Sequence, residues 1–120
     1  EVGSTDIPLN VDWEVYFHLE DTGKLKVFTA RKNGSLIGYF LTISFNSLQS
    51  KGHTLITNDA IYLDPDHRGI GKHLFTFVEG CLREDGYDSL IVTATERHKI
   101  DRFLECMGYD KIETRFRKVL

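Results

Sequence analysis

The residues best suited to chemistry lie at positions 64–72, which read Asp-Pro-Asp-His-Arg-Gly-Ile-Gly-Lys. A strand-forming run over residues 55–63 precedes them, and an amphipathic helical pattern follows. The first amides of a helix have no intrahelical acceptor, and the helix dipole favours negative charge there. Gly69 and Gly71 lack a Cβ, so an anion can approach the main chain closely. The stretch therefore predicts a phosphate site, although glycines so placed can also serve a turn alone.

Composition places the chain among ordinary soluble globular proteins. Its 120 residues favour a single domain with a substantial core, and 41% hydrophobic and 28% charged residues are typical of that class. The formal charge of −3 gives no general signature of polyanion binding, so a nucleic-acid role would need a local basic patch. No apolar run approaches the roughly 18 residues of a membrane span, and no signal-peptide pattern opens the chain. We therefore expect no membrane association.

The two cysteines fit a reducing compartment. Cys81 and Cys106 fall in apolar helical patterns without metal-ligand spacing, so we expect reduced core residues and no metal site. Cysteines used in this way are consistent with a cytoplasmic protein.

Hydrophobic periodicity predicts strands and helices that follow one another closely after a loosely held lead-in over residues 1–10. Antiparallel strands followed by strand–helix–strand units indicate an α/β fold with a mixed sheet and helices on its faces. The expected elements are a helix over residues 13–19 capped by Asp12, a hairpin of strands 24–31 and 36–45, a strand over 55–63, the helix after the glycine-bearing stretch, a strand over 89–95, a helix over 96–107 closed by Gly108, and an edge or swapped strand over 111–120.

Aromatic residues crowd the first predicted helix. Trp13, Tyr16, Phe17 and Leu19 cluster too densely for a helix that is solvated all round. Part of this segment is therefore expected to lie against the core or to line a cleft, with core packing favoured.

Two stretches together resemble the GNAT family of acyl-CoA-dependent N-acetyltransferases. Residues 59–74, Asp-Ala-Ile-Tyr-Leu-Asp-Pro-Asp-His-Arg-Gly-Ile-Gly-Lys-His-Leu, look like the family's fourth strand, pyrophosphate loop and following helix. Residues 103–109, Phe-Leu-Glu-Cys-Met-Gly-Tyr, are similar to its last helix and terminal Gly-aromatic pair, and the hairpin with Gly38-Tyr39 looks like its second and third strands. The resemblance covers roughly residues 10–118. The family's first strand and first helix have no evident counterpart, so the chain looks N-terminally short.

The resemblance implies transfer of an acetyl group from acetyl-CoA, as co-substrate, to a primary amine by direct attack. A main-chain N–H at a splayed fourth strand would hold the thioester oxyanion. The strand end and the loop would hold the pyrophosphate. The cofactor-binding candidates are Leu63, Arg68, Gly69, Ile70, Gly71 and Lys72.

A protonated amine is not a nucleophile, so the reaction needs a proton acceptor. Asp59 is the first candidate, because the family often has an acidic residue there and a carboxylate within an apolar strand needs a purpose or a partner. The alternative is a carboxylate satisfied by main-chain donors or an arginine. Glu96 is the second candidate, and it and His98 could face the same cleft, although each is favoured as a helix-start residue. His53, in the loop before the strand, could touch the acceptor, although an exposed loop histidine is favoured. Tyr62, three residues beyond Asp59, is expected on the opposite sheet face as core packing.

Three features depart from the family pattern. Asp66 stands where the family usually has Arg or Gln, and the loop is about two residues shorter than usual. Leu104 occupies the position of a tyrosine that protonates the departing thiolate in many members. Leucine cannot donate a proton, so a catalytically weak or inactive acyl-CoA-binding module of the same fold is the alternative. A nucleotide-binding protein is disfavoured, because residues 69–72 lack the longer phosphate cradle.

The acceptor is open at this stage. A small molecule or a protein amine is favoured, and a modified nucleobase is possible. The acidic balance favours a cationic acceptor weakly, and the terminal strand could pair across a homodimer.

Overall fold

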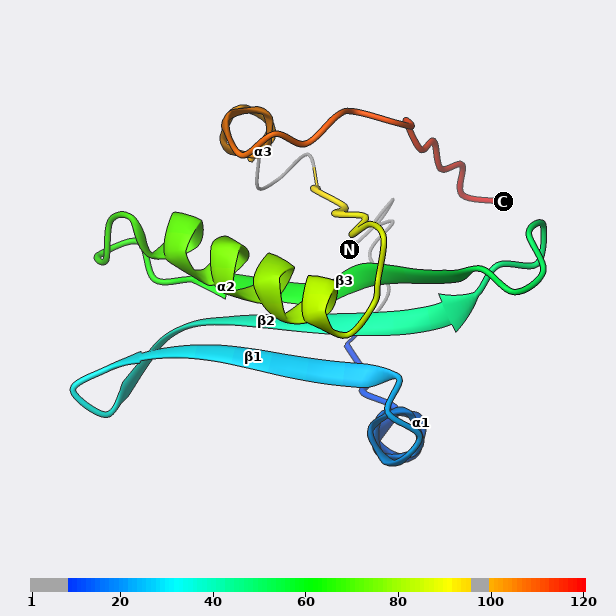
Figure 1. The fold of residues 1–120 in the computed structure, drawn as a ribbon, viewed down its shortest axis with the longest axis horizontal. Helices are drawn as coiled ribbons and strands as arrows, with labels where there is room; N and C mark the ends of the chain where they lie inside the picture. The colour runs from blue at the N-terminus through cyan, green and yellow to red at the C-terminus, as the bar shows by residue number, and fades with distance from the viewer. Residues whose placement is uncertain (1–8, 96–99) are drawn as a thin grey trace.

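The computed structural model describes residues 9–95 and 100–120 (Figure 1). Its central element is an antiparallel sheet in the order β1-β2-β3. In the view of Figure 1, α1 lies below β1, and α3 with the C-terminal segment lies above β3. The elements in chain order are α1 (Trp13–Asp21), β1 (Leu25–Lys32), β2 (Ser35–Asn46), β3 (Thr54–Leu63), α2 (Ile70–Glu84) and α3 (Asp101–Cys106).

Local signals set the first helix and the hairpin as the sequence predicts. The Asp12 side chain accepts a hydrogen bond from the Val15 amide at 3.2 Å and so caps α1. The turn between β1 and β2 has positive φ at Asn33 (51°) and Gly34 (82°), the conformation that tight hairpins require. This turn fixes the register of β1 against β2.

The core lies between the sheet and α2, which packs on β1 and β2. Phe75 of α2 is fully buried and meets Phe40 of β2 edge-to-face, with ring centroids 5.0 Å apart. The amphipathic pattern of α2 explains its position, because its buried residues recur at three- and four-residue spacing. The buried members of the core cluster are Phe40, Ile56, Leu74, Phe75, Val78 and Leu82.

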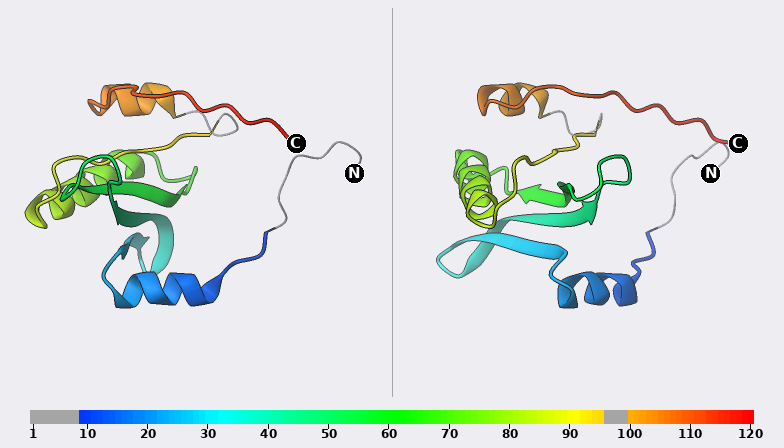
Figure 2. Two further views of the ribbon diagram at one scale, coloured as in Figure 1. Left: turned by 90° about the vertical axis from the view of Figure 1, so that its right-hand side faces the viewer. Right: turned by 45° about the vertical axis from the view of Figure 1, so that its right-hand side comes forward.

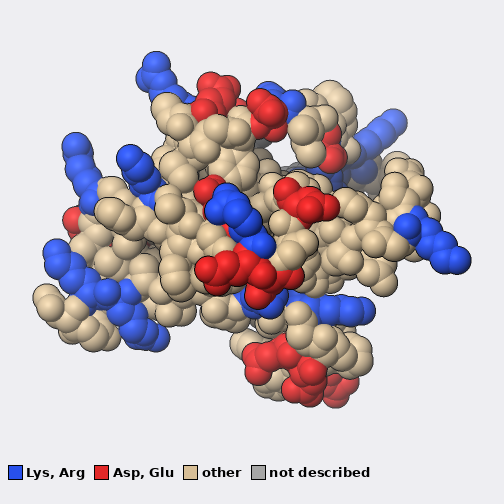
Figure 3. All heavy atoms as spheres, in the orientation of Figure 1, with Lys and Arg blue, Asp and Glu red and all other residues tan. Residues whose placement is uncertain are grey.

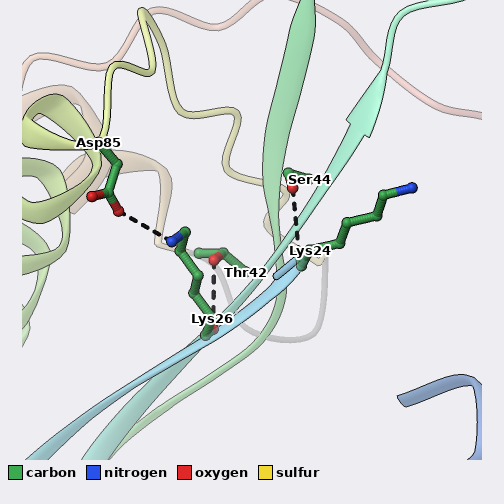
Figure 4. Close-up of polar contacts among 5 residues, drawn as sticks. All are labelled: Lys24, Lys26, Thr42, Ser44 and Asp85. Atoms are coloured by element: carbon green, nitrogen blue, oxygen red, sulfur yellow. Dashed lines mark hydrogen bonds and ion pairs between the residues drawn. The ribbon is translucent and has the colours of Figure 1, made fainter. Parts of the chain in front are cut away.

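Two buried hydroxyls on β2 lie among these apolar side chains. Thr42 is fully buried and donates to the Lys26 carbonyl, and Ser44 donates to the Lys24 carbonyl, each at 3.5 Å (Figure 4). Their long hydrogen bonds still satisfy groups that would otherwise cost free energy on burial. Lys26 also forms an ion pair with Asp85 at 3.1 Å, which joins β1 to the end of α2.

The predicted mixed sheet is present only in rudiment among the described residues. The stretch 89–95, expected to be a strand, contributes one parallel bridge, between Ile91 and Thr57 of β3. The stretch 111–120, expected to be an edge strand, has no strand pairing and is exposed throughout. Alternation alone cannot make a strand, because an isolated strand needs a neighbour to satisfy its main chain. The helix expected over 96–107 is seen as the shorter α3, and residues 96–99 lie outside the described ranges.

Three side-chain predictions were wrong. Tyr62 is 40% exposed and contacts Tyr39 across the strands, with ring centroids 5.5 Å apart, rather than packing in the core. Cys106 is exposed, whereas Cys81 is partly buried, and both are free thiols. The aromatic residues of α1 do not form core, because the helix has no buried residue.

Candidate functional site

Asp59 is the extra residue of a β-bulge in β3. Thr42 of β2 pairs with Asn58, and the preceding Leu41 pairs with Ala60, so Asp59 has no partner opposite. A bulge shifts the alternation of side chains by one residue and aims the extra residue independently. This shift is why Ile56 and Ile61, an odd number of residues apart, both pack toward the core.

The Asp59 carboxylate is exposed and accepts a hydrogen bond from the Tyr16 hydroxyl of α1. That hydrogen bond, with smaller contributions from burial and from the carboxylate charge, raises the pKa of Tyr16 above its ordinary value of 10.0. Tyr16 therefore stays neutral and acts as a donor at physiological pH. In the left view of Figure 2, α1 lies below the sheet and extends to the side opposite α2. The carboxylate is thus held on the side of the sheet that α2 leaves uncovered.

Asn58, next to Asp59, joins β3 to the stretch 89–95 through its side chain. Its amide oxygen accepts from the Thr93 N–H at 2.7 Å, and its amide nitrogen donates to the Thr93 carbonyl at 3.2 Å. Two residues earlier on each segment, the main chains bond directly, because the Ile91 N–H donates to the Ile56 carbonyl at 3.0 Å. Direct pairing therefore gives way to a side-chain bridge at Asn58, immediately before the bulge.

The loop after β3 and the first turn of α2 present free amides. Among the described residues, the amides of Arg68, Gly69, Gly71 and Lys72 have no acceptor. Gly69 caps the helix with φ of 85°, and a Cβ there would meet no atom within 4 Å. Unsatisfied amides at the start of a long helix suit a phosphate group. Arg68 and Lys72 are exposed and add positive charge beside these amides.

The acidic residues of this loop are held by the loop itself. The Asp64 amide donates to the Ile37 carbonyl at 2.8 Å, which fixes the end of β3 against β2. The Asp64 side chain accepts from the Asp66 amide at 2.9 Å and lies 3.1 Å from Nδ1 of His67. Asp66, at the position where the family usually has Arg or Gln, is exposed.

Gly71 serves packing as well as the loop. It is buried, and a Cβ there would lie 3.2 Å from the Leu63 side chain and 3.3 Å from the Phe103 ring. Leu63 and Phe103 are partly buried and pack against the core, and Ile70 opens α2 partly buried. Of the predicted cofactor-binding residues, Arg68, Gly69 and Lys72 are therefore the exposed ones.

Of the remaining sequence candidates, His53 alone lies among the described residues, and it does not join Asp59. Glu96 and His98 lie outside the described residues. His53 is an exposed loop residue whose main chain bonds to Ser47 and Ser50. Sequence reasoning missed the roles of Tyr16 and Asn58, because their partners are distant along the chain and neither contact leaves a local signal.

Other kinds of site find little support in the described ranges. No group of three or more His, Cys, Asp or Glu side chains there could hold a metal ion. Within the same ranges, no helix combines the length and apolar character needed to cross a bilayer. Two cavities of about 250 and 340 Å³ lie around Tyr87, beyond the end of α2. His53 lines the larger one, whereas Asp59, Asn58 and the loop residues 64–72 line neither.

Comparison with known proteins decides the family. The acetyltransferase (GNAT) family matches residues 4–109, which is most of the chain. The chain belongs to this family. The resemblance carried by the glycine-bearing loop and the last helix is thereby confirmed, and GNAT membership supports acetyltransferase activity in general. No curated protein has significant sequence similarity to the chain.

Solved structures confirm the GNAT fold at low sequence identity. A ribosomal-protein-alanine N-acetyltransferase from Brucella melitensis biovar Abortus 2308 is 21% identical with a TM-score of 0.66, over 92% of this chain and 82% of that one. An acetyltransferase from Trypanosoma brucei is 20% identical with a TM-score of 0.68, over 98% and 84%. An aminoglycoside acetyltransferase from an uncultured soil metagenomic sample, in complex with sisomicin, is 21% identical with a TM-score of 0.67, over 99% and 79%.

Proposed function

We propose that this GNAT protein transfers an acetyl group from acetyl-CoA to a primary amine by direct attack, with Asp59 as the proton acceptor. The free amides of Arg68, Gly69, Gly71 and Lys72 would bind the pyrophosphate of CoA. Main-chain pairing changes to a side-chain bridge at Asn58. The β3 main chain beyond this point would hold the thioester oxygen.

Asp59 and Tyr16 have different roles in the proton transfers. Asp59 accepts one proton from the ammonium group, and the freed lone pair attacks the carbonyl carbon of the thioester. The C–N bond forms, the C–S bond breaks, and CoA departs as a thiolate that takes the second amine proton. Tyr16, held neutral by its raised pKa, donates to the carboxylate and fixes its orientation.

The observation that carries this proposal is the position of Asp59. An exposed carboxylate stands at the extra position of a bulge, one residue after the Asn58 bridge, on the strand that ends at the loop with free amides. A proton acceptor and an anion site thus belong to the two ends of one short strand segment, as acetyl transfer from a CoA thioester requires.

The test begins with calorimetric titration of the protein with acetyl-CoA and with CoA alone. Binding of both supports the loop assignment, and release of free thiol in the presence of amines supports catalysis. Lys72→Glu should weaken the binding of both, because it places negative charge beside the free amides. Arg115→Glu, in the exposed C-terminal stretch, makes the same charge change elsewhere and is the control. Failure of both ligands to bind would overturn the proposal.

One observation favours the catalytically weak acyl-CoA-binding alternative. Leu104, at the position of the family's general acid, packs against the core and offers no hydroxyl. Under this alternative, acetyl-CoA binds but thiol release stays at the uncatalysed rate with every amine offered. A thiol is itself a fair leaving group, with an ordinary pKa of about 8.5, so loss of the tyrosine alone does not exclude catalysis.

A further inference from the structure

Helix α1 presents three aromatic rings beside Asp59. Trp13 is 62% exposed and Phe17 60% exposed, and their rings stack with centroids 6.2 Å apart. The Tyr16 ring lies 6.4 Å from that of Trp13, and its hydroxyl donates to Asp59. Residues three and four apart share one face of a helix, so these rings and the carboxylate form a continuous surface. We call Trp13, Tyr16, Phe17 and Asp59 the aromatic patch.

Within the part of the chain that the structure describes, the negative charge of the aromatic patch has no paired cation. Among the described residues, no basic side chain pairs with Asp59, and Tyr16 is its only hydrogen-bond donor. Acidic side chains also gather over α1 in Figure 3, and those of Asp12, Glu14, Glu20 and Asp21 are exposed there. Their field attracts a cation toward a surface that is otherwise made of ring faces.

Resting on the proposed function, we propose that the aromatic patch binds the acceptor, and that the acceptor is a primary amine joined by a short linker to an aromatic ring. The ammonium group contacts the Asp59 carboxylate, where the proton is removed. The ring packs on Trp13 and Phe17, whose faces also attract positive charge.

Other amines match the aromatic patch less well. A simple alkylamine leaves the exposed rings uncovered. An aminoglycoside carries several charges and hydroxyls, whereas the surface beside Asp59 offers ring faces and one carboxylate. The rings of the aromatic patch therefore select the acceptor by the group that carries the amine, and Asp59 selects the amine itself.

Trp13 is the only tryptophan of the chain, so its fluorescence reports directly on the aromatic patch. The probe is 2-phenylethylamine, titrated into the full protein without acetyl-CoA. We expect a saturable change of emission, with butylamine and 2-phenylethanol binding at least about fivefold more weakly, since one lacks the ring and the other the charge. Equal responses to all three compounds would overturn the proposal.

Two variants and a control locate the binding. Phe17→Ala should weaken 2-phenylethylamine about fivefold by removing a ring contact, and Asp59→Asn about tenfold by removing the charge. Phe116→Ala removes an aromatic side chain that is 93% exposed in the C-terminal stretch, and should leave binding unchanged. Unaltered binding in Phe17→Ala would contradict the assignment.

The outcomes separate this proposal from the proposed function. Binding of acetyl-CoA without a response to 2-phenylethylamine overturns the aromatic patch alone. Response to the amine without binding of acetyl-CoA supports the patch and overturns the transfer reaction. Emission that depends on protein concentration and not on the amine assigns the patch to contact with a second copy, and overturns the proposal. A higher kcat/KM for an aminoglycoside, or for a peptide that begins with alanine, than for 2-phenylethylamine also overturns the proposal.

Discussion

At the scale of single residues, Asp59 is exposed on a strand and is still held in one place. A regular strand would place its side chain in strict alternation with its neighbours, whereas the bulge frees it from the pairing with β2. Tyr16 then fixes the carboxylate from outside the sheet. Burial is not needed to orient the group, and the carboxylate stays open to an acceptor.

We expect Asp59→Asn to lower kcat by about 100-fold or more, because general-base catalysis contributes on that order. Binding of acetyl-CoA should be unchanged, since the substitution keeps the shape of the side chain and does not touch the loop amides. Steady-state kinetics and calorimetric titration measure the two effects separately.

The control for this prediction is Asp110→Asn, which neutralises an exposed carboxylate just after α3. It should leave both kcat and acetyl-CoA binding at the wild-type level. A wild-type rate for Asp59→Asn at every pH would remove Asp59 as the proton acceptor.

At the scale of elements, Asn58 decides where β3 stops pairing with the stretch 89–95. Its two hydrogen bonds to Thr93 replace a main-chain pair and hold the two segments at a side chain's distance. We expect Asn58→Leu to raise the KM for acetyl-CoA several-fold, because both Thr93 groups lose their partner and the spacing is no longer fixed.

The variant Asn58→Asp distinguishes two effects on the KM, the spacing between β3 and the stretch 89–95 and the loss of the side chain's hydrogen bonds. Its carboxylate can still accept from the Thr93 N–H but repels the Thr93 carbonyl, so the KM should lie between those of the wild type and Asn58→Leu. Asn46→Leu, at the end of β2, is the control and should keep the wild-type KM. Equal KM values in all four proteins would show that the bridge does not position the acetyl-CoA site.

The variant Gly71→Ala tests how closely α2 packs against Leu63 and Phe103. An added methyl would lie 3.2 Å from Leu63 and 3.3 Å from Phe103, tighter than ordinary contact, so Gly71→Ala should lower the free energy of unfolding by roughly 1–3 kcal/mol. Denaturant unfolding measures the change. Gly80→Ala, on the same helix with no atom within 4 Å of its added Cβ, should not be destabilised. Similar unfolding free energies for the two variants would mean that α2 shifts to accept the methyl.

The elements that the sequence predicted well are those with local causes. The Asp12 cap, the Asn33-Gly34 turn and the apolar spacing of α2 act within a few residues, so their effect can be read from the chain. The bulge at Asp59 could not be predicted, because the residue reads as one member of a continuous strand. The contact between Tyr16 and Asp59 joins positions 43 residues apart, and only the fold brings them together.

The strand predicted over residues 111–120 was wrong, although its local pattern is that of a strand. Residues 111–120 carry the alternation of a strand, but alternation describes which face a strand would bury and not whether a partner exists. In the structure Ile112 is 67% exposed, so its side chain has no sheet face to cover. The helix start predicted near residues 68–72 is present with its free amides, which follow from the start of any helix. The binding of a cofactor there stays a prediction.

At the scale of the whole molecule, Phe75 joins the layers on which the site depends. Its ring lies edge-on to Phe40 of the sheet at 5.0 Å and to Phe103 of α3 at 5.1 Å. Tyr109, just beyond α3, meets the same ring at 6.1 Å and donates its hydroxyl to Glu79 of α2. This aromatic cluster and the hydrogen bond from Tyr109 to Glu79 therefore help to hold α3 against α2.

Burial, and then the hydrogen bond to Glu79, raises the pKa of Tyr109 well above its ordinary value of 10.0. The folded state therefore keeps the phenol neutral at a pH where the unfolded chain begins to ionise it. The stability from this difference is fully present below pH 10.0 and is lost as the pH rises through the higher folded-state value. Tyr109→Phe keeps the ring against Phe75 but removes both the hydroxyl and its titration.

We expect Tyr109→Phe to lower the free energy of unfolding at neutral pH by roughly 0.5–1.5 kcal/mol, the usual net value of a hydrogen bond, and toward the lower end because the site is partly exposed. Above pH 10.0 the difference from the wild type should narrow, since only the wild type loses the stability tied to the phenol. Urea unfolding at neutral and alkaline pH tests both statements. Tyr62→Phe, on an exposed ring of β3, should be nearly neutral at neutral pH. A constant difference between Tyr109→Phe and the wild type across this range would show that the phenol does not link α3 to α2.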